Sequence, residues 1–267
     1  MSLGASFEPP PPPTPPEGHG LLSGKVVIVT AAAGTGIGSA TARRCLEEGA
    51  AVVVSDAHER RLGETAEELR AETGGEVHAI ACDVTDESQV RALYEGARAQ
   101  YGHFDVAVHN AGLGGTVPLV DMTDAQWARV LEVTLTGTFR CTRAALTHLL
   151  AQQGGAIVNN ASVLGWRAQP GQAHYAAAKA GVMALTRCAA AEAAPFGVRV
   201  NAVSPSLAEH PFLNRAIPDE DLAVLRRREL FGRGAQTWEV ANVIVFLASD
   251  YSSYMSGEVI SVSSQHP

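Results

Sequence analysis

The chain has 267 residues, of which 46% are apolar and 18% charged, a length and composition that fit one globular domain with a sizeable core. Its 20 basic and 28 acidic side chains give a net charge of −8, which argues against nucleic acid or an anionic membrane surface as a partner. No stretch of eighteen uninterrupted apolar residues occurs, so we expect no membrane span.

The first 22 residues form a segment of their own, because seven of the 14 prolines lie between Pro9 and Pro16. Consecutive prolines lack N–H donors and hold an extended conformation, so residues 1–22 are predicted to be a disordered tail and residues 23–267 the folded domain. The alternative interpretation of residues 1–22 is a proline-rich ligand that binds in the groove of another protein. The segment has no Lys, Arg or apolar run, so it does not resemble a secretory signal.

Apolar β-branched runs alternate with helical periodicity along the remainder. Buried strands are expected at 26–29, 51–54, 77–81, 106–109, 156–159, 198–203 and 260–262, and early helices at 39–48, 58–71 and 86–100. Uniformly apolar strands separated by helices predict a parallel sheet that is covered on both faces. The fold class is therefore α/β, a single Rossmann-like, doubly wound domain of about seven strands.

The turn between the first strand and the first helix is rich in glycine, with Gly34, Gly36 and Gly38. Glycines there let the backbone approach a pyrophosphate, which the N–H groups of the following helix can bind. Asp56 ends the second strand, where a carboxylate accepts the ribose hydroxyls and repels a 2′-phosphate. The turn has no basic residue, so NAD is favoured over NADP, although Arg60 and Arg61 lie near Asp56 in the sequence.

Tyr175 and Lys179 are four residues apart in an alanine-rich stretch with strong helical character. That spacing places both side chains on one helix face, where the ammonium should lower the pKa of the phenol and make it a usable acid and base. Ser162 follows the strand at 156–159, so its hydroxyl can lie at the carboxyl edge of the sheet, where doubly wound folds bind ligands.

Cysteine and histidine give no sign of a metal centre. Four isolated cysteines with apolar neighbours are predicted to be reduced core residues of a cytoplasmic protein: Cys45, Cys82, Cys141 and Cys188. The nine histidines form no His-Glu-x-x-His pattern, so no metal site is expected.

In order along the chain, these motifs resemble the short-chain dehydrogenases/reductases, in particular the 3-oxoacyl reductases. The resemblance spans about residues 24–265 and rests on the glycine turn, Asp56, Cys82-Asp83-Val84, Asn110-Ala111-Gly112, Ser162, Tyr175-x-x-x-Lys179 and Ser204-Pro205. It implies that Tyr175 transfers a proton, Ser162 orients the substrate oxygen, and Lys179 holds the nicotinamide ribose and tunes Tyr175. The implied cofactor contacts are Gly34, Gly36, Ile37, Gly38, Asp56, Asp83, Val84, Asn110, Ala111, Gly112, Tyr175, Lys179, Pro205 and Ala208.

The sequence departs from the family pattern at four places. The glycine turn is one residue longer and has Ala31 after Thr30, and Thr134 stands where the family has a catalytic Asn that holds a water in a proton relay. The family has a Gly after the proline of the nicotinamide loop, where this sequence has Ser206 after Pro205. The family Thr five residues after that proline is replaced by His210. The usual Val-Asp-Gly-Gly near the C-terminus reads Val-Ser-Ser-Gln over 262–265. We assign Thr134 the water-holding role by position.

The departures, with the runs at 159–167 and 253–259, resemble an actinobacterial group that acts on ring hydroxyls of coenzyme A thioesters from steroid C/D-ring breakdown. A segment after Pro205 with Phe212, Leu213, Ile217, Leu222, Leu225 and Phe231 is expected to be a lid over a hydrophobic alcohol or ketone. Trp166 is a candidate pocket wall or a packing residue. The run at 226–228 could meet coenzyme A phosphates, although a solvated helix face is favoured.

Other functions remain open. A 3-oxoacyl-(acyl carrier protein) reductase of fatty-acid metabolism is the alternative enzyme, and a catalytically silent NAD-binding or assembly protein is the alternative of another class. A serine hydrolase is disfavoured because Ser162 lacks the Gly-x-Ser-x-Gly elbow. An enoyl reductase is also disfavoured, because enoyl reductases of this fold usually have a wider Tyr-to-Lys spacing. Carbonyl reduction is therefore preferred over double-bond reduction. Resemblance and the long alanine-rich helices at 136–150 and 176–194 imply a homotetramer.

Overall fold

The computed structural model describes residues 9–211 and 219–264. Its centre is a parallel sheet of seven strands in the order β3-β2-β1-β4-β5-β6-β9. The strands are β1 (Val26–Thr30), β2 (Ala51–Asp56), β3 (Val77–Ala81), β4 (Val106–His109), β5 (Gly155–Asn160), β6 (Val198–Pro205) and β9 (Val259–Val262). The predicted fold class is confirmed, and the strands start and end within two residues of the predicted ranges.

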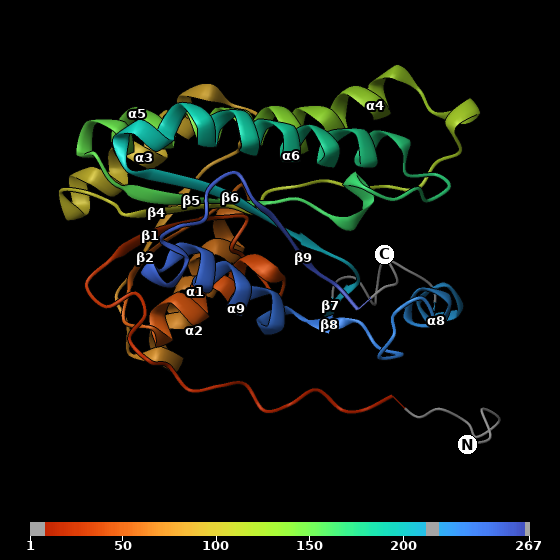
Figure 1. The fold of residues 1–267 in the computed structure, drawn as a ribbon, viewed down its shortest axis with the longest axis horizontal. Helices are drawn as coiled ribbons and strands as arrows, with labels where there is room; N and C mark the ends of the chain where they lie inside the picture. The colour runs from red at the N-terminus through yellow and green to blue at the C-terminus, as the bar shows by residue number, and fades with distance from the viewer. Residues whose placement is uncertain (1–8, 212–218, 265–267) are drawn as a thin grey trace.

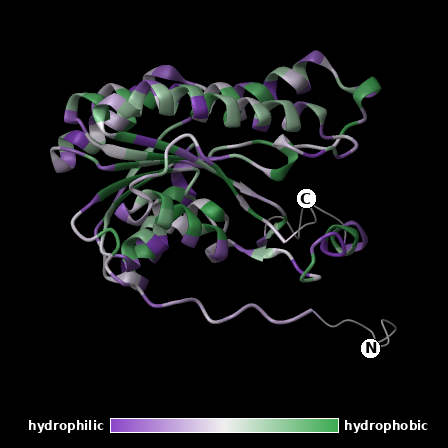
Figure 2. Cartoon of the chain, viewed as in Figure 1, coloured by the Kyte–Doolittle hydropathy of each residue, from purple (hydrophilic) through white to green (hydrophobic). Residues whose placement is uncertain are grey.

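Helices cover both faces of the sheet, as Figure 1 shows. On one face lie α1 (Ile37–Glu47), α2 (Glu59–Thr73) and α9 (Thr237–Ala248). On the other lie α3 (Glu87–Tyr101), α4 (Asp124–Leu131), α5 (Gly137–Gln152) and α6 (Ala173–Ala193). The sheet strands are largely hydrophobic in Figure 2, as expected for strands buried on both sides.

Helix starts follow local capping chemistry. Thr85 and Asp86 form a capping signature before α3 in the sequence, and the Asp86 carboxylate does accept hydrogen bonds from the Ser88 and Gln89 amides. Helix α1 begins two residues earlier than predicted, at Ile37, with Gly36 as its cap. The short strands β7 (Ala208–Glu209) and β8 (Ala235–Gln236) were not predicted, because two-residue strands carry no periodicity. Helix α8 (Asp219–Arg226) lies in the segment that was expected only as a lid.

The inner end of the proline-rich segment is held against α1. Arg44, itself buried, donates hydrogen bonds to the carbonyls of Pro16 (2.6 Å) and Glu17 (3.0 Å). The fully buried Glu48 pairs with Arg44 and accepts the amides of His19 (2.8 Å) and Leu21 (3.0 Å). The predicted disordered tail therefore does not extend to residues 16–22, because α1 supplies the polar partners that this backbone lacks within itself.

Three of the four cysteines are buried, and burial raises the pKa of each thiol: Cys45, Cys82 and Cys141. Cys188 is exposed on α6, so its predicted place in the core is wrong. The alanine-rich sequence of α6 hides which face is inward, since alanine occurs on both faces. Among the described residues, no cluster of His, Cys, Asp or Glu could hold a metal ion, and no helix is long and apolar enough to cross a membrane.

A chain of buried polar side chains crosses the core from α3 to α6. The Tyr94 hydroxyl lies 2.8 Å from His109 Nε2, and His109 Nδ1 lies 2.8 Å from Asn159 Oδ1. The Asn159 amide donates to the Thr186 hydroxyl at 2.9 Å. Burial lowers the pKa of His109 to about 4, although the Asn159 hydrogen bond acts to raise it. The imidazole is therefore neutral in the folded protein at neutral pH.

Because the His109 imidazole is buried in its neutral form, we expect the free energy of unfolding to fall at acidic pH. A folded-state pKa near 4, below the unfolded value near 6.5, means that unfolding takes up a proton between these pH values. The stability that the protein gains from burying a neutral His109 is fully present above pH 6.5. Below that pH the free energy of unfolding falls by about 1.4 kcal/mol per pH unit. Urea unfolding of wild type and His109→Asn at pH 7 and pH 5 tests this. Wild type should lose about 2 kcal/mol more than the variant, and equal losses would contradict the prediction.

Candidate active site

A cleft of about 420 Å³ opens at the carboxyl ends of the central strands. Its lining comes from the turns after β1, β4, β5 and β6, from α6 and from α8: Ala31, Gly36, Ile37, Asn110, Gly112, Ser162, Leu164, Gln169, Gln172, Tyr175, Ser206, Leu207, Ala208, His210 and Leu225. The cleft lies where β1 neighbours β4, the point at which the strand order reverses. Doubly wound folds bind ligands at this switch point.

The glycine turn has the shape that a pyrophosphate site needs. Gly34 has φ +90°, a conformation that disfavours side chains, and a Cβ on Gly38 would lie 2.1 Å from the Ala31 carbonyl oxygen. No side chain caps the N-terminus of α1, so its first N–H groups stay available to an anion. Ala31, after Thr30 in this turn, has φ +51°, a left-handed conformation that residues other than glycine rarely adopt. The chemistry of this cradle fits a dinucleotide cofactor.

Asp56 stands at the tip of β2 beside this turn. Its carboxylate accepts the Ala33 amide at 3.3 Å and the His58 amide at 2.9 Å, which fixes its direction. Asp83 and Val84, which the family resemblance implies as further cofactor contacts, are both used within the fold. Asp83 accepts the amide and the hydroxyl of Thr85 at 2.9 and 2.8 Å, and the Val84 side chain is buried in the core, so only its backbone can face a ligand.

Asn110 joins the turn after β4 to the glycine turn. Its amide donates to the Ala31 carbonyl at 3.1 Å, and its backbone N–H to the Thr30 hydroxyl at 3.0 Å. Asn160, at the end of β5, donates its side-chain amide to Asn110 Oδ1 at 2.7 Å. Three neighbouring strand ends are thereby fixed relative to one another, and the predicted Asn110-to-Gly112 segment contributes Asn110 and Gly112 to the cleft lining.

Ser162 and Tyr175 meet in the cleft. Ser162 accepts the Leu164 amide at 3.2 Å, which holds it at the start of a short 3₁₀ turn. Burial raises the pKa of Tyr175, and a hydrogen bond with Ser162 acts in the opposite direction. The predicted lowering of the Tyr175 pKa by Lys179 is not found, since the Lys179 Nζ lies 5.6 Å from the ring centre and the net shift is upward. Tyr175 is therefore protonated at neutral pH.

Lys179 is almost fully buried on the same face of α6. Its Nζ donates to the Asn160 backbone carbonyl, and burial lowers its pKa to about 8. A Cβ on Gly112 would lie 3.4 Å from this Nζ, so the ammonium faces the predicted cofactor segment. At neutral pH the group still holds its proton.

Thr134, the predicted water-holding residue, is hydrogen-bonded to the loop that follows β4. Its hydroxyl accepts the Leu113 amide at 2.9 Å and donates to the Leu113 carbonyl at 3.0 Å. The residue lies in a π-helical segment, Glu132–Thr136, between α4 and α5. Both hydrogen bonds go to the backbone of Leu113, so Thr134 holds the loop beside Gly112, and its water-binding role stays a prediction.

The expected lid is only partly at the cleft. Leu225 of α8 lines it, Leu222 is buried beneath, and Phe231 lines a separate small cavity. Phe212, Leu213 and Ile217, and Gln265 near the C-terminus, lie outside the described residues. Trp166 is half exposed and is not among the residues that line the cleft.

Arg226 is not free for a phosphate, because Glu209 pairs with it through both carboxylate oxygens, whereas Arg227 and Arg228 are exposed. Sequence reasoning missed Leu164, Gln169 and Gln172 as lining residues. Gln172 lies three residues before Tyr175, and only that proximity could have pointed to it. His210, noted as a departure, does line the cleft.

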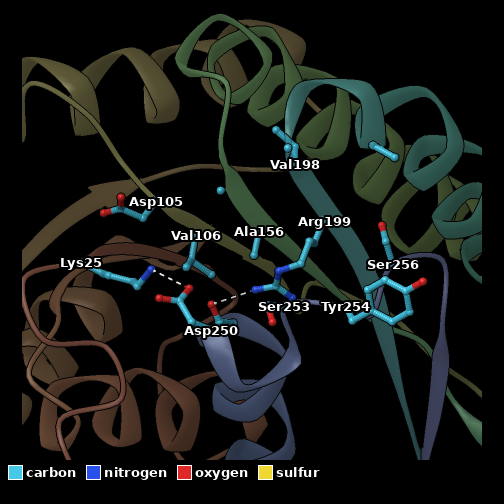
Figure 3. Close-up of a pocket in the computed structure, with 14 residues that line it drawn as sticks. Lys25, Asp105, Val106, Ala156, Val198, Arg199, Asp250, Ser253, Tyr254 and Ser256 are labelled. Atoms are coloured by element: carbon cyan, nitrogen blue, oxygen red, sulfur yellow. Dashed lines mark hydrogen bonds and ion pairs between the residues drawn. The ribbon is translucent and has the colours of Figure 1, made fainter.

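A second hollow, of about 540 Å³, lies at the opposite end of the sheet (Figure 3). Its charged groups have partners within the fold: Lys25 pairs with Asp250 at 3.2 Å (Figure 3). Arg199 donates to the Leu247 carbonyl at 2.8 Å, at the end of α9. These contacts close a helix terminus and leave no convergent set of reactive groups there.

The chain is similar to known proteins over nearly its whole length. A family model described as enoyl-(acyl carrier protein) reductase matches residues 31–264. A Mycobacterium tuberculosis protein is 66% identical over 94% of this chain and 96% of the relative's length. Its name is (5R,7aS)-5-hydroxy-7a-methyl-1-oxo-2,3,5,6,7,7a-hexahydro-1H-indene-carboxyl-CoA reductase. Cis-4-hydroxycyclohexanecarboxylate dehydrogenase of Sinomonas cyclohexanicum is 44% identical over 89% and 94%. The 3-oxoacyl-[acyl-carrier-protein] reductase of Thermotoga maritima is 39% identical over 90% and 97%.

Solved structures give the same result. A short chain dehydrogenase from Mycobacterium smegmatis superposes with a TM-score of 0.85 at 61% identity, covering 96% of this chain and 98% of the other. An NAD⁺-bound xylitol dehydrogenase superposes with a TM-score of 0.87 at 32% identity, covering 91% and 99%. These similarities extend over the strands and turns that form the cleft.

Proposed function

This chain belongs to the short-chain dehydrogenase/reductase family, and on that premise we propose that it acts on a ring alcohol or ketone carried by a coenzyme A thioester. It is an oxidoreductase that moves a hydride between a nicotinamide cofactor and a secondary alcohol or ketone. The observation that carries the substrate proposal is the 66% identity, over 94% of the chain, to a reductase named for an indene-carboxyl-CoA.

NAD is the proposed cofactor. The glycine turn and the N-terminus of α1 would hold its pyrophosphate, Asp56 its adenosine ribose, and Lys179 its nicotinamide ribose. When bound, the nicotinamide ring supplies or accepts the hydride. Asp83, Val84, Ala111, Pro205 and Ala208 stay proposed contacts by family resemblance, and Ala208 also lines the cleft.

In reduction, the chain's own residues handle the proton. Tyr175, protonated at neutral pH, donates its hydroxyl proton to the substrate oxygen as the carbonyl becomes an alcohol, and Ser162 orients that oxygen. The hydrogen bond with Ser162, which acts to lower the pKa of Tyr175, stabilises the phenolate that forms. In oxidation the phenolate takes the hydroxyl proton, so that direction should speed up as the pH rises.

A panel of matched substrates tests the substrate class. We expect the coenzyme A thioester of a hydroxy- or keto-substituted bicyclic carboxylic acid to be turned over with NAD(H), and the free acid at least about tenfold more slowly in kcat/KM, a difference of about 1.4 kcal/mol. Equal rates for thioester and free acid would contradict the proposed carrier requirement. A 3-oxoacyl-(acyl carrier protein) substrate in the same panel tests the alternative, a fatty-acid reductase, which the relative at 39% identity supports.

Asp56 provides a prediction about cofactor choice. Asp56→Asn keeps the shape but removes the charge, so NAD should bind about tenfold more weakly, while NADP binding should improve because the repulsion of its 2′-phosphate is lost. Fluorescence titration with both cofactors measures the change. Glu59→Gln, three residues away and exposed, is the control for general charge and should alter neither affinity. Tighter binding of NADP than NAD by wild type would overturn the assignment.

We also propose a homotetramer in the cytoplasm. Helices α5 and α6 leave a groove of about 440 Å³ whose lining includes Phe139, Leu146, Leu150 and Leu185, and Phe139 is exposed. Exposed apolar surface of this kind is typical of a subunit interface. Light scattering at micromolar concentration should give four times the monomer mass of 27.9 kDa, and a monomer would contradict the proposal.

A further inference from the structure

Glu229 is a buried carboxylate outside the catalytic set. It is 4% exposed and lies in the loop that follows α8. Its Oε2 accepts the Ser206 hydroxyl at 3.1 Å and the Ser264 hydroxyl at 3.0 Å, and its Oε1 accepts the Leu207 amide at 3.3 Å. A carboxylate removed from water is costly unless such donors satisfy it, so this arrangement depends on all of these groups together.

The carboxylate connects three segments that are far apart in the sequence. Ser206 and Leu207 follow β6 and line the cleft, and Ser264 follows β9. The Glu229 loop continues from α8, whose Leu225 also lines the cleft. Backbone hydrogen bonds support the same junction, from the Ser206 amide to the Val262 carbonyl (3.1 Å) and from the Leu230 amide to the Ser264 carbonyl (2.8 Å).

Ser206 and Ser264 are also two of the positions at which this sequence departs from the family pattern, which has glycine at both. A glycine has no side-chain donor, so neither hydrogen bond to Glu229 could form with the family residues. The two departures lie 58 positions apart in the sequence, yet they share one carboxylate oxygen. This common partner indicates a matched set and not two independent neutral replacements.

We propose that Glu229 is a positioning residue that holds the loop 205–209, through Ser206, Leu207 and Ser264, in the conformation that forms the nicotinamide and substrate wall of the cleft. The carboxylate is not catalytic, since it contacts the loop and not the Ser162–Tyr175 pair. The inference rests on the proposed use of this cleft for NAD and substrate. Its effect should fall on binding of both ligands and much less on the chemical step.

The experiment is a double-mutant cycle between Glu229→Gln and the pair Ser206→Ala/Ser264→Ala. The readouts are the NAD dissociation constant by fluorescence titration, KM and kcat, and the thermal midpoint. Because hydrogen bonds to a charged group are lost, the NAD dissociation constant and KM should each rise about five- to tenfold in each variant. The kcat should change less than about twofold. Because one network is broken in both, the triple variant should be no weaker than Glu229→Gln alone.

Glu220→Gln, an exposed carboxylate on α8, is the matched control and should leave all readouts unchanged. Effects that multiply in the triple variant, or a lower thermal midpoint with unchanged NAD affinity and KM, would overturn the positioning role. Direct NAD titration does not depend on the substrate, so failure of the thioester panel would leave this test intact. Should Glu229→Gln not fold, Ser206→Gly/Ser264→Gly, which restores the family residues, gives the same NAD readout.

Discussion

Replacing Tyr175 by Phe is expected to lower kcat by about 10²–10⁴-fold while NAD binding and the thermal midpoint stay near wild type. The substitution removes one hydroxyl, the proposed proton donor, and keeps the ring that packs in the cleft beside Lys179. Because burial raises the pKa of Tyr175, the wild-type reduction rate should be flat near neutral pH and fall only at alkaline pH.

Tyr251→Phe is the control, since Tyr251 is 75% exposed, is not among the residues that line the cleft, and also loses one hydroxyl. Stopped-flow measurement of NADH absorbance with a turned-over substrate gives kcat for both variants. A Tyr175→Phe enzyme within threefold of wild type would remove Tyr175 from its proposed role. If that variant loses NAD binding as well, the hydroxyl serves the implied cofactor contact of Tyr175, and the rate loss no longer supports its assignment as the proton donor.

Replacing Glu48 by Ala should destabilise the fold by about 3–5 kcal/mol, the usual cost of removing one partner of a buried ion pair. The change leaves Arg44 of α1 buried without the Glu48 carboxylate and removes the acceptor for the amides of His19 and Leu21. Burial acts to raise the pKa of Glu48, but these amides and Arg44 outweigh it and the net pKa is lowered. The stabilisation is therefore present at neutral pH and is lost as the pH falls through the lowered value.

Glu47 offers a matched control on the same arginine. It pairs with Arg44 at 3.1 Å, but its side chain is 39% exposed, so Glu47→Ala should cost less than about 1 kcal/mol. Urea unfolding at pH 7 compares the two variants. Similar small losses in both would show that the Arg44–Glu48 pair contributes no more than a surface contact. Limited proteolysis should at the same time cut the Glu48→Ala variant within residues 16–22, which lose their anchor.

Many of the residues that line the cleft could be predicted from the sequence, because the fold places the ends of its strands predictably. In a parallel sheet the carboxyl ends of all strands lie at one edge, so residues that follow different strands must meet there. Asn110 and Ser162 therefore come together although 52 positions separate them. The four-residue spacing of Tyr175 and Lys179 is likewise a local property of the helix, which needs no tertiary information.

The errors share one cause. The anchoring of residues 16–22 and the exposure of Cys188 depend on which distant groups pack against them. The pKa of Tyr175 is set mainly by burial, which the sequence spacing to Lys179 does not report. Periodicity shows that a helix has an inner face, but in the alanine-rich α6 it does not tell which face that is.

By itself, then, the sequence determined the α/β class, the approximate strand ranges, the glycine turn and the set of polar residues at the sheet edge. Short-range periodicity and chain connectivity carry that information. Only the tertiary structure decided that Ser206 and Ser264 share the Glu229 carboxylate, and that Arg44 and Glu48 hold residues 16–22. Buried hydrogen bonds between distant segments leave no periodic trace in the sequence, since each donor finds its acceptor only when the packed helices and strands bring them within about 3 Å.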